Sequence, residues 1–264
     1  MTKVDSSKHN FDFWQTEART RKFRIMKGLQ KPEKAIFDLF SDQLKIAFTL
    51  DLGVGCGRTS PVLNERSSKY LGTDYSQKMI DVCNELHPTI DFSVMDARNM
   101  QGIEDESVDF VVFSYNGIDC VGHDDRLAIF AEVRRVLKPS GRWIFSSHNR
   151  NFTELGEIRN PWNTRYLSGL INPLKAPKIL GKYFIGIRAH ARLKASQIEN
   201  TDYAVLNEQT NRFRELMYYI TPDSQLRQLK TAGFNTESMW NTEGQNSNPY
   251  TETCPWIYYV CSKA

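Results

Sequence analysis

The fold is decided by the stretch Leu50-Asp51-Leu52-Gly53-Val54-Gly55-Cys56-Gly57. It ends an apolar run that starts at Ile46 and predicts a buried strand, and it places three alternate glycines in the turn after that strand. Only glycine combines easy access to positive φ with close approach of the backbone to a ligand. The stretch therefore predicts a strand that ends in a loop suited to a nucleotide-like ligand.

Strand and helix signals alternate after this turn, which is typical of a parallel sheet with crossover helices. Further strands are expected at 70–73, 91–95, 108–114, 142–147, 236–241 and 256–261. Ser76 and Thr221 are expected to cap helices, and Lys138-Pro139-Ser140-Gly141 is expected to separate a helix from the strand at 142–147. The alternation breaks between Asn149 and Tyr218, where two strands are possible, at 202–207 and 212–220.

These patterns predict three parts of the chain. Residues 1–45 are expected to form an N-terminal helical lid, residues 46–148 and 221–264 the ligand-binding core, and residues 149–220 an inserted substrate cap. A length of 264 residues, with 40% hydrophobic and 25% charged residues, is ordinary for one large α/β domain with such an elaboration.

Charge and cysteine content exclude several classes of protein. A formal net charge of +3 falls well short of the strongly basic surface typical of nucleic-acid binding. The five cysteines are scattered and form no C-x-x-C pair or Cys/His cluster, so neither a disulfide framework nor a metal site is expected. No signal peptide and no run of membrane-spanning length is present, and we expect a cytoplasmic protein that does not enter a membrane.

The spacing of the glycines separates two kinds of nucleotide ligand. In the dinucleotide motif G-x-G-x-x-G the third glycine would stand at position 58, which is Arg58 here, so NAD and FAD are disfavoured. Asp74 follows Gly53 by roughly 20 residues, the offset at which a carboxylate accepts hydrogen bonds from ribose hydroxyls. Asp96-Ala97 follows the next strand and is placed to contact an adenine, while Asp51 could balance a cationic ligand.

These residues resemble the class I S-adenosylmethionine-dependent methyltransferase family, whose glycine motif D-x-G-x-G-x-G stands here from Asp51 to Gly57. The resemblance extends over about 46–147 and 221–264, including R-R-V-L-K-P-S-G and T-P-D-S-Q-L-R-Q-L-K-T-A-G-F in the family's order. It implies an α/β fold with a Rossmann-like seven-stranded sheet, mostly parallel with an antiparallel last strand, plus the N-terminal helices and the inserted cap.

The resemblance also implies a cofactor and its contacts. The cofactor would be S-adenosyl-L-methionine, with S-adenosyl-L-homocysteine as product. The glycines would hold its methionine part, Asp74 its ribose, and Asp96 with Ala97 its adenine, while Ser114 and Tyr115 would line the reaction centre. The cofactor-binding residues expected on this basis are Asp51, Gly53, Gly55, Gly57, Asp74, Tyr75, Asp96, Ala97, Ser114 and Tyr115.

Methyl transfer from a sulfonium needs alignment and exclusion of water, and it needs a base only when the acceptor atom carries a proton. The candidates at the carboxyl ends of the fourth and fifth strands are Tyr115, Asn116, Asp119, His123 and His148. We predict catalytic roles for His148 and Tyr115; the alternative for His148 is a local structural role, and for His123 a helix cap. Acceptor contacts are predicted for Trp14, Asn116, Asp119 and Tyr218.

The segment after the fourth strand bears on the acceptor. Family members that methylate amino groups of nucleic-acid bases often carry N-P-P-Y there, whereas this chain has Ser114-Tyr115-Asn116-Gly117. The favoured prediction is a monomeric or homodimeric enzyme that methylates an O or N atom of a small-molecule metabolite. The alternatives are an RNA or protein acceptor, a non-catalytic cofactor-binding protein and a nucleotide-dependent oxidoreductase.

Overall fold

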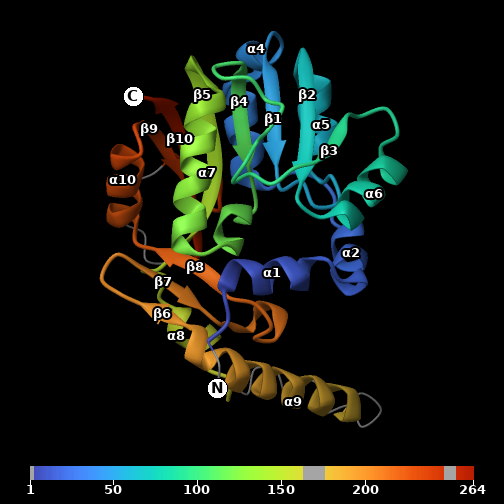
Figure 1. Cartoon of the computed structure of the whole chain (residues 1–264), viewed down its shortest axis with the longest axis vertical. Coiled ribbons are helices and arrows are strands. Elements are labelled where there is room, and N and C mark those ends of the chain that lie inside the picture. Colours follow the sequence, from blue (N-terminus) through green and yellow to red (C-terminus); the bar gives the residue numbers. More distant parts are fainter. Residues whose placement is uncertain (1–2, 163–175, 247–253) are drawn as a thin grey trace.

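A computed structural model of the protein describes residues 3–162, 176–246 and 254–264. In this part of the chain ten strands form one sheet in the order β3-β2-β1-β4-β5-β8-β7-β6, with β10 paired to β5 and β9 paired to β10 (Figure 1). The strands expected from the sequence to build the core are β1 (Phe48–Leu52), β2 (Lys69–Asp74), β3 (Phe92–Val94), β4 (Val108–Phe113), β5 (Leu137–Asn149), β9 (Phe234–Trp240) and β10 (Trp256–Lys263). The pairs among β1 to β5 are parallel, and β10 is antiparallel to β5 and β9. The predicted Rossmann-like sheet is confirmed.

Helices cover both faces of this sheet. They are α3 (Lys31–Leu39), α4 (Ser41–Leu44), α5 (Ser60–Arg66), α6 (Gln77–Leu86), α7 (His123–Val136) and α10 (Pro222–Thr231). On one face Phe130 of α7 and Leu229 of α10 are buried with Val111 and Trp143. On the other face α3, α4 and α5 bury apolar side chains such as Ile36 against Phe110 of β4. Because successive strand residues point to opposite faces, β4 contributes to both cores.

Local signals explain where these elements begin. The Ser76 hydroxyl accepts a hydrogen bond from the backbone of Met79, and that of Thr221 accepts one from Ser224, so both predicted caps are confirmed. The expected break at 138–141 is wrong, because β5 begins directly after α7, at Leu137. A register irregularity opposite, between Val108 and Phe110 of β4, accommodates the additional residues of β5.

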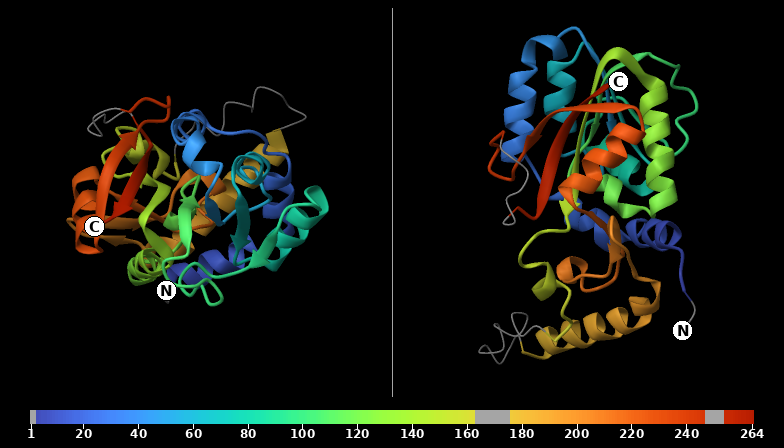
Figure 2. Two further views of the ribbon diagram at one scale, coloured as in Figure 1. Left: turned by 90° about the horizontal axis from the view of Figure 1, so that it is seen from above. Right: turned by 90° about the vertical axis from the view of Figure 1, so that its left-hand side faces the viewer.

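The segment 149–220 extends the sheet and adds helices beside it. It contains α8 (Leu155–Ile158), α9 (Ala176–Leu193), η3 (Lys194–Ser196), β6 (Ile198–Glu199), β7 (Tyr203–Leu206), η4 (Gln209–Asn211) and β8 (Met217–Ile220). The two strands considered possible in this segment are present as β7 and β8, and β8 pairs with the last residues of β5. Figure 2 shows this layer, with α9 outermost, at one end of the core sheet.

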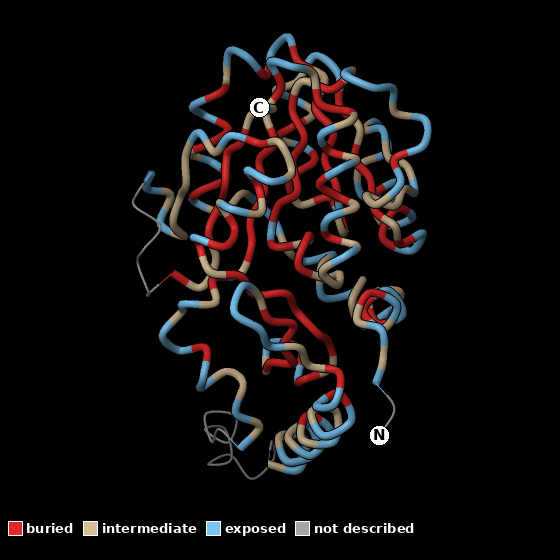
Figure 3. Tube along the Cα trace, turned by 60° about the vertical axis from the view of Figure 1, so that its left-hand side comes forward, coloured by how far each residue is buried: buried red, intermediate tan, exposed pale blue. Residues whose placement is uncertain are grey.

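The N-terminal helices α1 (Ser6–Trp14) and α2 (Glu17–Arg24) lie at the same end of the sheet (Figure 1). Asn10 fixes α1 there, because its buried amide donates to the carbonyl oxygens of Cys120 and Leu216 and accepts from the Leu216 N–H. Buried residues are concentrated in the core strands and again in β7 and β8, while α9 is mostly exposed or half-buried (Figure 3). No helix in the described ranges has the length and apolar character required to cross a bilayer.

Candidate active site

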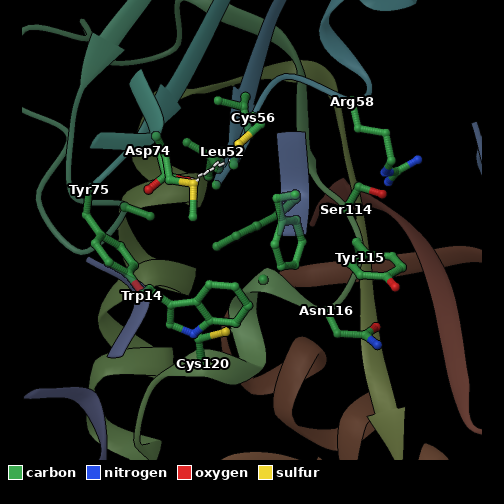
Figure 4. A pocket seen from close by; sticks show the side chains of 18 of the residues that line it. Trp14, Leu52, Cys56, Arg58, Asp74, Tyr75, Ser114, Tyr115, Asn116 and Cys120 are labelled. Atoms are coloured by element: carbon green, nitrogen blue, oxygen red, sulfur yellow. Dashed lines mark hydrogen bonds between the residues drawn. The ribbon is translucent and has the colours of Figure 1, made fainter. Parts of the chain in front are cut away.

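A pocket lies where the carboxyl ends of β1, β2, β4 and β5 meet the N-terminal helices and the 149–220 segment. The core contributes the glycine turn, Asp74, Tyr75, Met95, Ala97, the turn after β4, and His148. The N-terminal helices and the 149–220 segment contribute Trp14, Lys22, Phe23, Glu208, Thr210, Asn211, Glu215 and Met217, and β10 contributes Trp256, which pairs with His148. Figure 4 shows Asp74, Tyr75 and Cys56 on one side of this space and Tyr115 and Asn116 on the other, with Trp14 between them.

The three glycines of the turn all have positive φ, of 61° at Gly53, 57° at Gly55 and 78° at Gly57. A Cβ on Gly53 would stand 2.5 Å from Phe113 Cε2, so packing against β4 also requires glycine there. A Cβ on Gly55 would meet only Phe23, at 3.7 Å, so it would project into the pocket. The turn therefore exposes backbone to a ligand at Gly55.

Asp74 connects this turn to the end of β2. Its carboxylate accepts hydrogen bonds from the backbone N–H of Gly55, at 3.0 Å, and of Ser76, at 2.8 Å. Burial raises the pKa of Asp74 to about 6, although these two hydrogen bonds oppose the shift. An acceptor-only carboxylate at this place fits the hydroxyl donors of a ribose.

Asp51 lies at the base of the pocket and is almost fully buried. The hydroxyl groups of Thr59 and Tyr70 donate to its Oδ2, at 2.7 and 3.0 Å. Burial raises the pKa of Asp51 to about 7 despite these hydrogen bonds. Asp51 forms no ion pair within the described residues, although the charge of Arg58 also opposes the rise in its pKa.

The two residues predicted to contact the adenine, Asp96 and Ala97, have different surroundings in the structure. Ala97 lines the pocket, and the Tyr75 ring packs 5.2 Å from that of Phe11 beside it. The Asp96 carboxylate instead accepts hydrogen bonds from Arg98, whose Nε lies 3.0 Å from both of its oxygens. Asp96 is therefore paired with Arg98 at this edge of the sheet.

The turn after β4 holds its residues in a strained conformation. Tyr115 and Asn116 both have positive φ, of 54° and 59°, which non-glycine residues rarely adopt. The Asn116 N–H donates to Ser146 Oγ at 2.8 Å and so fixes this geometry. Such strain is commonly concentrated at functional sites. It directs Tyr115 and Asn116 toward the pocket (Figure 4).

Ser114 precedes this turn, and its hydroxyl group is already hydrogen-bonded to another part of the protein. Its hydroxyl bonds to Glu33 of α3, which also accepts two hydrogen bonds from Arg58, at 2.6 and 2.5 Å. Burial alone would raise the pKa of Glu33, but the Arg58 guanidinium holds it below its ordinary value. The guanidinium also lies 5.3 Å from the centre of the Tyr115 ring. Glu33 and Arg58 thus hold Ser114 and contact the Tyr115 ring, contacts that the sequence did not predict.

His148 stands at the end of β5 and faces the pocket. Its Nδ1 lies 2.8 Å from Oδ2 of Asp119, which also accepts the His148 backbone N–H at 2.7 Å. The carboxylate therefore keeps a proton on Nδ1 and leaves Nε2 as an acceptor. Asn116 Nδ2 lies 3.2 Å from this Nε2 and is its donor. The predicted residues Asn116, Asp119 and His148 are thus brought together as a chain of hydrogen bonds.

Two of the predicted acceptor contacts are wrong. Asp119 is fully buried and is saturated by Arg126, Ser147 and His148, so it acts behind His148 and not on the acceptor. Tyr218 is also fully buried and does not line the pocket, and its hydroxyl bonds to His123 Nδ1 at 2.8 Å. His123 stacks on Tyr203 and is likewise outside the pocket. Strand alternation in β8 directs Tyr218 away from the side that Met217 presents to the pocket.

Comparison with known proteins agrees with this geometry. Residues 49–141 match the family model described as a methyltransferase domain. Among curated proteins, none matches this sequence. A 1,6-didemethyltoxoflavin-N1-methyltransferase from Burkholderia thailandensis, solved with 1,6-didemethyltoxoflavin and S-adenosylhomocysteine, superposes with a TM-score of 0.61 at 11% identity over 100% of this chain and 92% of that chain.

Two further solved structures are similar to this chain. An S-adenosylmethionine-dependent methyltransferase from Clostridium acetobutylicum gives a TM-score of 0.59 at 13% identity over 89% of this chain and 91% of that chain. A glycopeptide N-methyltransferase complexed with S-adenosylmethionine gives 0.56 at 12% identity over 91% of this chain and 96% of that chain. At such identities the likeness shows the fold.

Residues 49–141 thus match a methyltransferase domain, and the fold is that of the S-adenosylmethionine-dependent methyltransferases compared above. The domain match, and two similar structures solved with S-adenosylhomocysteine or S-adenosylmethionine, support the cofactor that the sequence predicts. The pocket fits it, since Gly55 opens onto the space and Asp74 offers a buried acceptor beside it. Within the described ranges, no group of three His, Cys, Asp or Glu side chains is arranged to hold a metal ion.

Proposed function

We propose that the enzyme transfers the methyl group of S-adenosylmethionine to an O or N atom of a small-molecule metabolite. The observation that carries this proposal is the closure of the pocket opposite the core. Trp14 and Phe23 from the N-terminal helices and Met217 from the 149–220 segment line that side. A covering contributed by two parts of the chain outside the core favours an acceptor that is enclosed and shielded from water.

The roles of the lining residues follow from their positions. The glycine turn and Asp74 hold the cofactor, with Asp51, Tyr75 and Ala97 beside it. When bound, the cofactor supplies a methyl group on a sulfonium, which needs no further activation by the protein. The N-terminal helices serve as a lid and residues 149–220 as a cap, so that the acceptor is aligned between Trp14, Tyr115 and Asn116.

His148 acts as the general base in this proposal. Its Nε2 takes the proton that the acceptor atom loses as it is methylated, and Asp119 stabilises the resulting imidazolium through Nδ1. Asn116 Nδ2, 3.2 Å from Nε2, orients the imidazole before the acceptor displaces it. Arg126 pairs with Asp119 at 2.6 Å behind the imidazole, and both side chains are fully buried.

Similar structures support a small acceptor. One is described as an N-methyltransferase of 1,6-didemethyltoxoflavin and another as a glycopeptide N-methyltransferase. Both of these relatives resemble the chain over most of its length, including the region beyond the matched domain.

The proposal is tested by incubating the protein with methyl-labelled S-adenosylmethionine and a fractionated cell extract. We expect label in the small-molecule fraction and none in RNA or protein. The matched control is Gly55→Val, which removes the open approach to the backbone and should give no labelled product. Label in RNA or protein, or in no fraction, would overturn the proposal.

The role of His148 has its own test, once the labelled acceptor is purified. His148→Gln should lower kcat by about 10²- to 10⁴-fold, the usual contribution of a general base, and leave the Kd for S-adenosylhomocysteine unchanged. His123→Gln, outside the pocket, is the control. Full turnover by His148→Gln would show that alignment alone suffices.

A further inference from the structure

The part of the pocket that is lined by the 149–220 segment contains two buried carboxylates, those of Glu208 and Glu215. Each residue is only 2% exposed. Glu208 precedes η4, and its Oε2 accepts from the backbone N–H and the hydroxyl of Thr210, both at 2.7 Å. Glu215 Oε1 accepts from the Asn211 amide, whereas Glu215 Oε2 has no hydrogen-bond partner among the described residues.

The nearest cations do not neutralise this pair. Arg19 and Lys22 both donate to Asn211 Oδ1, so the amide of Asn211 stands between them and Glu215. Among the ion pairs of the described residues, none involves Glu208 or Glu215. Burial, with a smaller contribution from the neighbouring Glu208, raises the pKa of Glu215 to about 7, although Asn211, Arg19 and Lys22 oppose this shift. Burial also raises the pKa of Glu208.

Another part of the pocket also contains buried polar atoms that lack hydrogen-bond partners among the described residues. Asp119 fixes the tautomer of His148, so that Nε2 is an acceptor. The Asn116 amide therefore turns its Nδ2 toward Nε2. This orientation leaves Asn116 Oδ1 buried without a hydrogen-bond partner among the described residues. The indole N–H of Trp256 is likewise buried and without a partner, and its ring packs 6.5 Å from that of Tyr115. An unsatisfied buried acceptor or donor costs free energy, so such groups are commonly completed by a ligand.

We infer that the acceptor carries a protonated amino group, bound by Glu215 and Glu208, at the end of the pocket lined by the 149–220 segment. This inference rests on the proposed function and names its substrate class. An ammonium has three donors and no acceptor, which suits the free Oε2 of Glu215 beside a second carboxylate. The Trp14, Phe23 and Trp256 rings suit the apolar body of such a molecule and stabilise a nearby cation through their faces.

The charge of the labelled product tests this inference. The labelled small-molecule product is first separated from unreacted S-adenosylmethionine, which is itself cationic, and is then passed over a strong cation exchanger at about pH 3, where carboxylates are largely neutral and amines are charged. We expect the label to be retained. Label in small molecules that pass unretained would overturn the amino-group inference and leave the proposed function standing, whereas no label in small molecules would overturn both.

Variants of the two carboxylates supply the second test. Glu215→Gln and Glu208→Gln keep the shape of each side chain and remove its charge. Each should raise the KM of the purified acceptor by about ten- to hundred-fold, with a smaller effect on kcat and none on the Kd for S-adenosylhomocysteine. Glu65→Gln, an exposed glutamate on α5, is the control. Unchanged KM in both variants, with cofactor binding intact, would overturn the inference.

Discussion

Asp74 makes cofactor binding depend on pH. Its carboxyl group, with a pKa raised by burial to about 6, is partly protonated near that pH when no ligand is present. Hydrogen bonds from ribose hydroxyls favour the ionised carboxylate and lower its pKa. Binding should therefore release protons around pH 6. At pH 8 the group is already ionised, and the release should disappear.

Calorimetry in buffers of different ionisation enthalpy measures this release. Asp74 is half protonated at pH 6 before binding, so we expect it to release up to about half a proton per bound S-adenosylhomocysteine in the wild type. Asp74→Asn should bind at least about tenfold more weakly, through loss of a charge-assisted hydrogen bond, and should release fewer protons. Because Asp51, with a pKa raised to about 7, is unchanged in this variant, the difference isolates Asp74. Equal proton release in both proteins would contradict the assignment of Asp74 to the ribose.

Asp119 is expected to affect stability as well as turnover. Asp119→Asn leaves the guanidinium of Arg126 charged and fully buried, and it should lower the free energy of unfolding by about 3–5 kcal/mol. The control is Asp125→Asn, because Asp125 pairs with Arg98 through side chains that are 33% and 35% exposed and should change stability by less than about 1 kcal/mol. Urea denaturation compares them. Equal losses in both variants would contradict the buried pair as a source of stability.

The elements show which features a sequence pattern can predict. The strand before the glycine turn, the capped helices at Ser76 and Thr221 and the last two strands follow from short-range signals, and the structure has them. The full length of β5 does not follow from short-range signals, because its first residue, Leu137, pairs with Val108 from a different part of the chain. The burial of the Glu33, Glu208 and Glu215 carboxylates also lacks a local signal, because it results from tertiary packing.

The same limit applies to the candidate site. Gly55, Asp74 and His148 could be predicted because each lies at or near the carboxyl end of a strand, and parallel strands end at one edge of the sheet. The inward or outward direction of Tyr218 depends on a strand register that the sequence does not specify, and here the prediction was wrong. Arg58 is next to the glycine motif, but its partner Glu33 belongs to a helix before β1.

Helix α1 depends on one side chain for its position. Asn10→Ala removes three buried hydrogen bonds to Cys120 and Leu216, and each backbone group left unsatisfied costs about 1–3 kcal/mol. We expect faster amide exchange across α1 and a higher KM for the acceptor, with cofactor affinity much less affected. Asn64→Ala on α5 is the matched control. Hydrogen exchange measured by mass spectrometry checks this, and unchanged protection of α1 would contradict it.

The whole molecule should be stabilised by its cofactor through mass action. At a concentration of S-adenosylhomocysteine 100 times its Kd, the gain is about 2.7 kcal/mol, which for a domain of this size raises Tm by roughly 5 °C. NADH should give no shift, because the glycine spacing disfavours dinucleotides. Thermal unfolding of the wild type and of Gly55→Val measures both effects. A shift with NADH in place of S-adenosylhomocysteine would contradict the cofactor assignment.

The junction between β5 and β8 bears on how this enzyme could acquire new acceptors. His148 pairs with Tyr219 and Asn149 with Ile220, and these two positions are the whole of the parallel pairing between the two strands. If residues 149–220 set the choice of acceptor, as we propose, a chimaera that keeps this two-residue pairing and takes residues 150–216 from another methyltransferase should change the acceptor while retaining the glycine turn, Asp74 and His148. Such a short junction would make specificity transplantable between members of this fold.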